Sequence, residues 1–99
     1  MEQLIVIYSM EGCPFCVMMK EQLETENIPF IVRDIDEEME EYDLFKKAVG
    51  GNEFVPAFMI IETDGENHNT KFFAPERDYD EIEDGVKIIK ENYENFNIQ

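Results

Sequence analysis

The sequence contains no tryptophan, a single histidine and only two cysteines among its 99 residues. A tetrahedral zinc site needs four ligands, so two cysteines and His68 fall short of one unless two chains share a site. No apolar run approaches the roughly 18 residues that a membrane-spanning helix needs. The N-terminus enters a strand-like run without a basic leader, so we expect no secretory signal. We therefore expect a cytoplasmic protein, in a compartment that keeps thiols reduced.

Basic residues are also scarce, since 8 lysines and arginines stand against 24 aspartates and glutamates and give a formal net charge of −16. This balance argues against binding to nucleic acid, whose backbone demands a basic protein face, and against anionic membrane surfaces. The charge serves solubility, or it steers the protein toward a basic partner surface. The length suits a single domain, residues 1–99, and a hydrophobic content of 43% supports one core.

The feature that the sequence does offer is the segment GCPFC at residues 12–16, between an apolar run at 4–8 and a stretch with helical spacing. The free N–H groups and partial positive charge at the start of a helix favour a thiolate. Such positions lower a cysteine pKa from about 8.5 to roughly 3.5–7.5. We therefore expect Cys13 to be exposed and nucleophilic at the helix start. Cys16 lies one turn further on, less exposed but within disulfide reach, and Pro14 suits the first helical position.

The rest of the chain alternates between strand-like and helix-like patterns. Strands are predicted at 3–8, 30–34, 57–61 and 70–73, and helices at 14–27, 36–49 and 79–96. The first strand, helix and strand form a βαβ unit, which makes the two strands parallel. Asp36 is predicted to cap the second helix, and Met18 and Met19 are predicted to pack in the core. The order β-α-β-α-β-β-α predicts an α/β fold, with a four-stranded mixed sheet flanked by three helices.

This order, with Cys-Pro-Phe-Cys after the first strand and Val55-Pro56 before the third, resembles the glutaredoxins and their thioredoxin-like fold. The resemblance implies that Cys13 attacks as a thiolate and that Cys16 resolves the mixed disulfide. It also implies a cis Pro56 facing the site, and a Val55 backbone that pairs with a bound peptide or glutathione. Pro14 and Phe15 would contact the substrate beside the cysteines.

The same resemblance implies the activity and its partners. The protein would be an enzyme that reduces protein disulfides and glutathione mixed disulfides by thiol–disulfide exchange, with glutathione as the reducing co-substrate. No tightly bound cofactor and no metal would be needed. Ribonucleotide reductase is one protein substrate known for the family, and a monomer is the expected state.

The segment before the last helix departs from the glutaredoxin pattern. Ala74-Pro75 stands where the family usually has Gly-Gly, although Asp78 matches the family's aspartate at the glutathione site. Arg77 would either bind a glutathione carboxylate or pair with Asp78. Glu11 places a carboxylate near the first cysteine, where it opposes both a thiolate and the anionic tripeptide.

Three alternatives follow from these residues. The first is a glutaredoxin-like protein reduced by thioredoxin reductase rather than by glutathione. The second is a metal or iron–sulfur centre shared by two chains. The third is a purely structural disulfide, although closing so small a ring removes little entropy from the unfolded chain.

Overall fold

The computed structural model describes residues 2–51 and 53–98, with side chains up to residue 93. Its elements are β1 (Glu2–Ser9), α1 (Pro14–Thr25), β2 (Ile31–Asp34), α2 (Met39–Ala48), β3 (Ala57–Asp64), β4 (Asn67–Phe73) and α3 (Ile82–Ile98). The strands form one sheet in the order β2-β1-β3-β4. Strand β2 is parallel to β1, whereas β3 is antiparallel to β1 and β4 is antiparallel to β3. The predicted α/β class, element order and mixed four-stranded sheet are confirmed.

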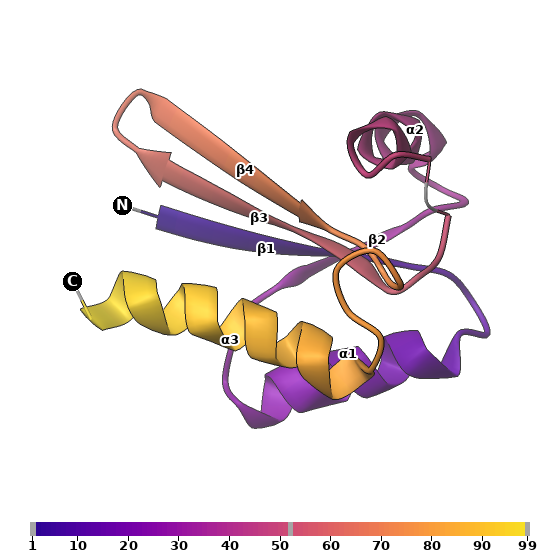
Figure 1. The fold of residues 1–99 in the computed structure, drawn as a ribbon, viewed down its shortest axis with the longest axis horizontal. Coiled ribbons are helices and arrows are strands. Elements are labelled where there is room, and N and C mark those ends of the chain that lie inside the picture. Colours follow the sequence, from indigo (N-terminus) through magenta and orange to yellow (C-terminus); the bar gives the residue numbers. More distant parts are fainter. Residues whose placement is uncertain (1, 52, 99) are drawn as a thin grey trace.

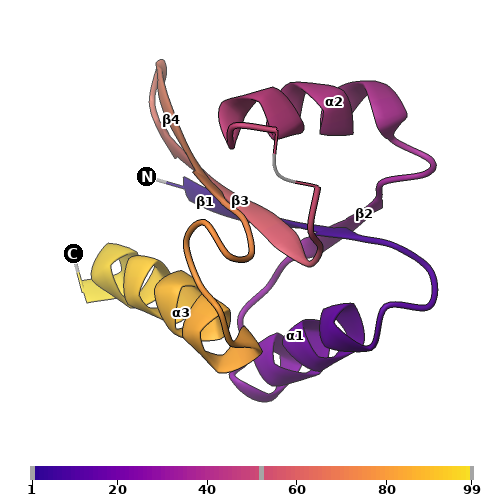
Figure 2. The same cartoon turned by 45° about the vertical axis from the view of Figure 1, so that its right-hand side comes forward.

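The sheet separates two layers of helix, with α1 and α3 on one face and α2 on the other (Figure 1, Figure 2). Side chains of β1 alternate between the two faces, as the pleat of a strand requires. Ile5 and Ile7 join the core under α1 and α3, whereas Val6 and Tyr8 join the core under α2. The continuous apolar run in the first strand therefore reflects burial on both faces. None of the described helices is long and apolar enough to cross a membrane.

The start of α2 differs from the prediction. Asp36 does not cap this helix, because its backbone N–H donates to the Asp34 carboxylate at 2.8 Å in a turn that precedes the helix. The helix begins at Met39 instead, and the N-cap residue Glu38 makes no side-chain hydrogen bond there. The carboxylate of Asp34, at the end of β2, stabilises an alternative turn and so delays the helix by about one turn.

The start of α3 differs for a similar reason. The helix begins at Ile82 rather than at Tyr79, because the preceding loop closes on itself. The Asp78 carboxylate accepts the N–H of Ala74 at 2.8 Å, and the N–H of Glu76 donates to the carbonyl of Tyr79 at 2.7 Å. The apolar spacing of the last predicted helix also predicts that Phe96 packs on the sheet, but this side chain lies outside the described ones.

Two further predictions need correction. Met19 is fully buried as expected, but Met18 is 42% exposed, because it lies one position round the helix from the buried stripe. The hairpin strands are also longer than predicted, since β3 and β4 remain paired as far as Asp64 and Asn67. The added pairs carry polar, largely exposed side chains, so hydrophobic alternation could not reveal them.

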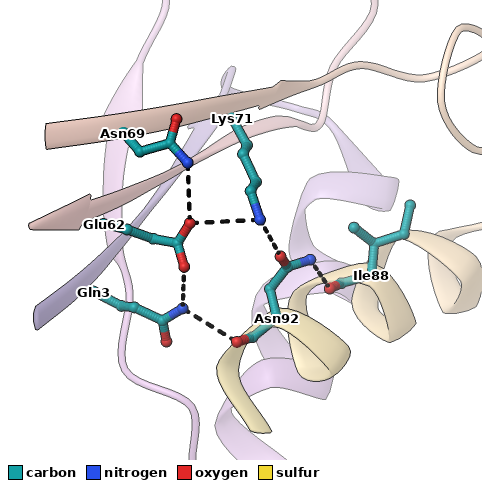
Figure 3. Close-up of polar contacts among 6 residues, drawn as sticks. All are labelled: Gln3, Glu62, Asn69, Lys71, Ile88 and Asn92. Carbon is teal, nitrogen blue, oxygen red and sulfur yellow. Dashed lines mark hydrogen bonds and ion pairs between the residues drawn. The ribbon is translucent and has the colours of Figure 1, made fainter. Parts of the chain in front are cut away.

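A polar network joins three strands to α3 (Figure 3). The Glu62 carboxylate on β3 lies 3.4 Å from the Lys71 ammonium group and accepts hydrogen bonds from Gln3 at 3.3 Å and Asn69 at 3.5 Å. Lys71 and Gln3 then donate to the side chain and the backbone carbonyl of Asn92, at 3.0 and 3.1 Å. The network fixes the far half of α3 against β1, β3 and β4, at the opposite end of the helix from its start beside α1.

Candidate active site

The two cysteines lie at the start of α1 and are joined by a disulfide, with their Cα atoms 5.3 Å apart. Gly12 adopts a positive φ of 78°, which a glycine tolerates at no steric cost, and so turns the chain from β1 into the helix. Cys13 is the N-cap residue, and its Sγ atom accepts a hydrogen bond from the Cys16 N–H at 3.1 Å. Pro14 occupies the first turn as predicted. The helix N-terminus is therefore directed at the sulfur of Cys13.

Cys13 is less exposed than the sequence suggested. Cys13 is 7% exposed and Cys16 is 0% exposed. The prediction that Cys13 is exposed is therefore wrong, whereas Cys16 is the less exposed of the two, as predicted. The physical reason is that the Cys13 sulfur turns inward to bond the sulfur and the N–H of Cys16. Cys13 still lines a surface depression of about 400 Å³, together with Glu11 and Lys20.

Pro56 lies directly before β3 and is held there by a residue 23 positions further along the chain. The Val55–Pro56 peptide bond is cis, as the resemblance implies, and Pro56 is fully buried. Its carbonyl accepts a hydrogen bond from the hydroxyl of Tyr79. Burial, with a smaller contribution from the Asp78 carboxylate, raises the pKa of Tyr79, so the hydroxyl keeps its proton.

The role of Tyr79 escaped the sequence analysis, which placed this residue at the start of the last helix. No local pattern marks this tyrosine, because its hydrogen-bond partner lies 23 positions away in the chain. The segment that carries it, between β4 and α3, folds over the end of the sheet near the start of β3 (Figure 1).

A groove of about 360 Å³ opens between α1, the segment before β3 and the loop before α3. Its apolar part contains Phe15, Phe54, Val55 and Pro56, and the two phenylalanines are 58% and 54% exposed. The structure therefore brings together Phe15, Val55 and Pro56, three of the residues predicted to bind substrate. Phe54, the most exposed apolar residue on the opposite wall, was not predicted because a single phenylalanine before a strand carries no pattern of its own.

Arg77 and Asp78 do not line this groove. The Arg77 guanidinium lies 2.7 Å from the Asp78 carboxylate and also donates to the carbonyl of Phe72 at 3.3 Å. Arg77 was predicted either to bind a glutathione carboxylate or to pair with Asp78, and in the structure it pairs with Asp78. The Asp78 carboxylate also accepts the N–H of Ala74, so both side chains stabilise the loop.

The charges around the site are mostly negative. Four carboxylates line the groove, from Glu76, Asp80, Glu81 and Glu83, and no lysine or arginine lines it among the described residues. Within the part of the chain that the structure describes, no three potential metal ligands cluster. A metal centre built from these residues would therefore need ligands from two chains, the alternative that the sequence analysis considers.

A mixed four-stranded sheet with a cysteine pair at a helix N-terminus suits thiol–disulfide exchange. A sequence model described as Glutaredoxin matches residues 5–63, which is more than half of the chain, so the chain belongs to the glutaredoxin family. The match includes both cysteines and Val55-Pro56 and ends before the loop that precedes α3.

Among solved structures, the chain is similar to a crystallised mutant of a thioredoxin-like protein, with 22% identity and a TM-score of 0.49. That similarity covers 55% of this chain and 72% of the other. No curated protein matches the sequence.

Proposed function

We propose that the protein is a dithiol glutaredoxin that reduces disulfides in proteins and mixed disulfides of glutathione. The observation that carries the proposal is the Cys13–Cys16 pair at the N-terminus of α1, in a chain of the glutaredoxin family. A structural disulfide is the weaker interpretation, because so small a ring stabilises the fold little. Cys13 is also the cysteine that reaches the surface depression.

Cys13 is the nucleophile in this mechanism. Its thiolate attacks one sulfur of the substrate disulfide, a new S–S bond forms, and the other substrate sulfur leaves as a thiolate and takes up a proton. The Cys16 N–H and the positive end of α1 stabilise the attacking thiolate before this step. A sulfur in this position is favoured as the thiolate, the form that attacks a disulfide.

Cys16 completes the exchange. Its deprotonated sulfur attacks the Cys13 sulfur, the mixed disulfide breaks, and the second substrate thiol leaves. Two electrons have then passed to the substrate, and the protein holds the Cys13–Cys16 disulfide that the structure contains. The helical turn that separates the two cysteines makes this second step intramolecular and therefore fast.

Regeneration of the dithiol needs a reductant. Two glutathione molecules would supply the two electrons and leave as oxidised glutathione, in keeping with family potentials of about −200 to −230 mV. Thioredoxin reductase is the second candidate, and the four carboxylates of the groove favour it, because glutathione carries a net negative charge. No tightly bound cofactor is required in either case.

Substrate would bind beside the dithiol. Pro14 and Phe15 would contact it from α1, and the backbone of Val55 would pair with it as a strand does. We propose a monomer acting in the cytoplasm on disulfide-containing proteins, with ribonucleotide reductase as one possible substrate.

The test compares two matched cysteine variants. Cys13→Ser should abolish reduction of every disulfide, because no nucleophile remains. Cys16→Ser should stop the reduction of protein disulfides but keep part of the activity on glutathione mixed disulfides, which needs only the first cysteine. Coupled assays that follow NADPH oxidation, one with glutathione and glutathione reductase and one with thioredoxin reductase, identify the electron source. Full activity in both variants would refute the mechanism.

A further inference from the structure

The groove that contains Phe15, the residue directly before Cys16, combines apolar side chains with an acidic rim. Phe15 and Phe54 expose more than half of their side chains there, which suits an apolar residue of a bound polypeptide. Glu76 and Asp80 line the same groove from the loop before α3, and both are exposed. A ligand that enters the groove therefore meets apolar surface and negative charge together.

The rim carboxylates are not neutralised by neighbouring side chains. Among the described residues, no ion pair and no side-chain hydrogen bond is formed by Glu76, Asp80, Glu81 or Glu83. The nearest arginine in the sequence, Arg77, is already paired with Asp78 and lies outside the groove. The charge at the rim is thus negative and favours a cationic ligand.

The loop that presents Glu76 is held in a fixed conformation. Glu76 has a φ of 68°, in the left-handed region that residues with a Cβ seldom adopt. Its N–H donates to the carbonyl of Tyr79 at 2.7 Å, and the Asp78 N–H donates to the carbonyl of Ala74 at 2.9 Å. The backbone of the loop therefore places Glu76 at the rim of the groove.

From these features we infer that the groove selects polypeptide disulfides with a lysine or arginine next to the cystine, and that Glu76 and Asp80 determine this specificity. This inference rests on the proposed function, and it names the substrate class. An apolar residue of the substrate packs against Phe15 and Phe54 while the neighbouring cation meets the rim. The exchange itself is the one already described and needs no further reactant.

The net charge of −16 would attract any cationic substrate, so the groove must be tested separately from the whole protein. Two double variants make this possible, because each removes one aspartate and one glutamate charge. Glu76→Gln with Asp80→Asn changes the rim of the groove. Asp84→Asn with Glu91→Gln changes two exposed residues of α3 that do not line the groove.

The assay mixes the fully reduced protein with an excess of a cyclic peptide disulfide and follows the loss of the protein dithiol, so no regenerating reductant is involved. Three peptides differ only in the residue beside each cysteine, which is lysine, glutamine or glutamate. Each rate is divided by the rate at which dithiothreitol reduces the same peptide, because neighbouring charges also alter the intrinsic reactivity of a disulfide. The measurements are made at about 10 and 150 mM salt, where the Debye length is about 30 and 8 Å.

We expect the wild-type protein to reduce the lysine peptide at least about tenfold faster than the glutamate peptide at low salt. In the groove variant, the ratio of the lysine-peptide rate to the glutamate-peptide rate should fall by a factor of about three to ten. The control variant should keep most of this ratio. Denaturation midpoints check that both variants are folded. Equal losses in the two variants, or equal rates for the three peptides, would overturn the inference and leave the proposed function intact. If the wild-type protein reduced none of the peptides, both would fail.

Discussion

Replacing Tyr79 with phenylalanine tests the hydrogen bond that joins the loop before α3 to Pro56. The ring would stay in place, because phenylalanine has the same shape without the hydroxyl, so no cavity forms. The hydrogen bond to the Pro56 carbonyl would be lost, and this carbonyl belongs to a fully buried residue. The substitution therefore isolates a single hydrogen bond between the loop before α3 and the start of β3.

The expected magnitude follows from the burial of the acceptor. A hydrogen bond contributes about 0.5–1.5 kcal/mol net, and a buried acceptor left without a donor costs about 1–3 kcal/mol. Because Pro56 is buried, we expect Tyr79→Phe to lower the free energy of unfolding by about 1–3 kcal/mol. For a chain of this size, each kcal/mol lowers the melting temperature by about 4–8 °C. Urea unfolding and a thermal melt measure both values.

The pH dependence of stability gives a second readout of the same contact. Burial raises the pKa of Tyr79 above the value of about 10 that it has in the unfolded chain. Between the two pKa values the folded protein keeps a proton that the unfolded chain has lost, so stability falls as the pH rises above about 10. The difference in the free energy of unfolding between the wild type and Tyr79→Phe should therefore be largest at neutral pH and should decrease above pH 10.

Tyr93→Phe is the matched control. Tyr93 is half-buried on α3, and its hydroxyl makes no hydrogen bond within the described residues. We expect this variant to be nearly as stable as the wild type. If Tyr79→Phe lost no more stability than Tyr93→Phe, the reasoning about the Pro56 carbonyl would be refuted.

The remaining predictions concern α3 and the dithiol. Gly85→Ala should destabilise the protein by about 1–2 kcal/mol in urea unfolding, although alanine favours a helix. The new Cβ would lie 3.0 Å from the Tyr79 ring, which is buried and hydrogen-bonded to the Pro56 carbonyl, whereas the terminal methyl group of Met19, at 2.9 Å, can shift. A more stable variant would contradict this contact. In reduced Cys16→Ser, the rate of alkylation of Cys13 by iodoacetamide should rise with a midpoint below pH 8.5, because the helix N-terminus stabilises the thiolate. A midpoint at or above 8.5 would leave Cys13 without the activation that the mechanism requires.

The sequence predicted the order of elements well, because each element has its own local pattern. The continuous apolar run of β1 and the stepwise apolar positions of α3 require no knowledge of the fold. The errors lie where a side chain competes for the backbone. Asp34 stabilises a turn before α2, and Asp78 closes a loop before α3, so both helices begin about one turn later than predicted. Such competition depends on geometry that a residue pattern does not contain.

The candidate site was predicted only in part, for a related reason. Cys13, Cys16 and Val55-Pro56 belong to motifs with a recognisable spacing. Glu76 and Asp80 are exposed carboxylates in a chain with 24 acidic residues, so nothing in the sequence distinguishes them. Only the topology places their loop against α1 and the start of β3. The departure from Gly-Gly at Ala74-Pro75 indicated that this loop differs from other glutaredoxins, but not how.

The loop before α3 contains two kinds of side chain, those that bond to the backbone and those that are exposed at the groove. Asp78 and Tyr79 bond to the backbone of Ala74 and Pro56, so their replacement changes stability together with the shape of the groove. Glu76 and Asp80 are exposed and bond to no side chain among the described residues, so their replacement changes the charge of the groove while the fold remains. If the rim selects substrates as inferred above, substitutions at Glu76 and Asp80 should change the substrate preference and leave the melting temperature almost unaltered. Stability and specificity would then be separable within one short loop, although the stabilising residues 77–79 lie directly between Glu76 and Asp80.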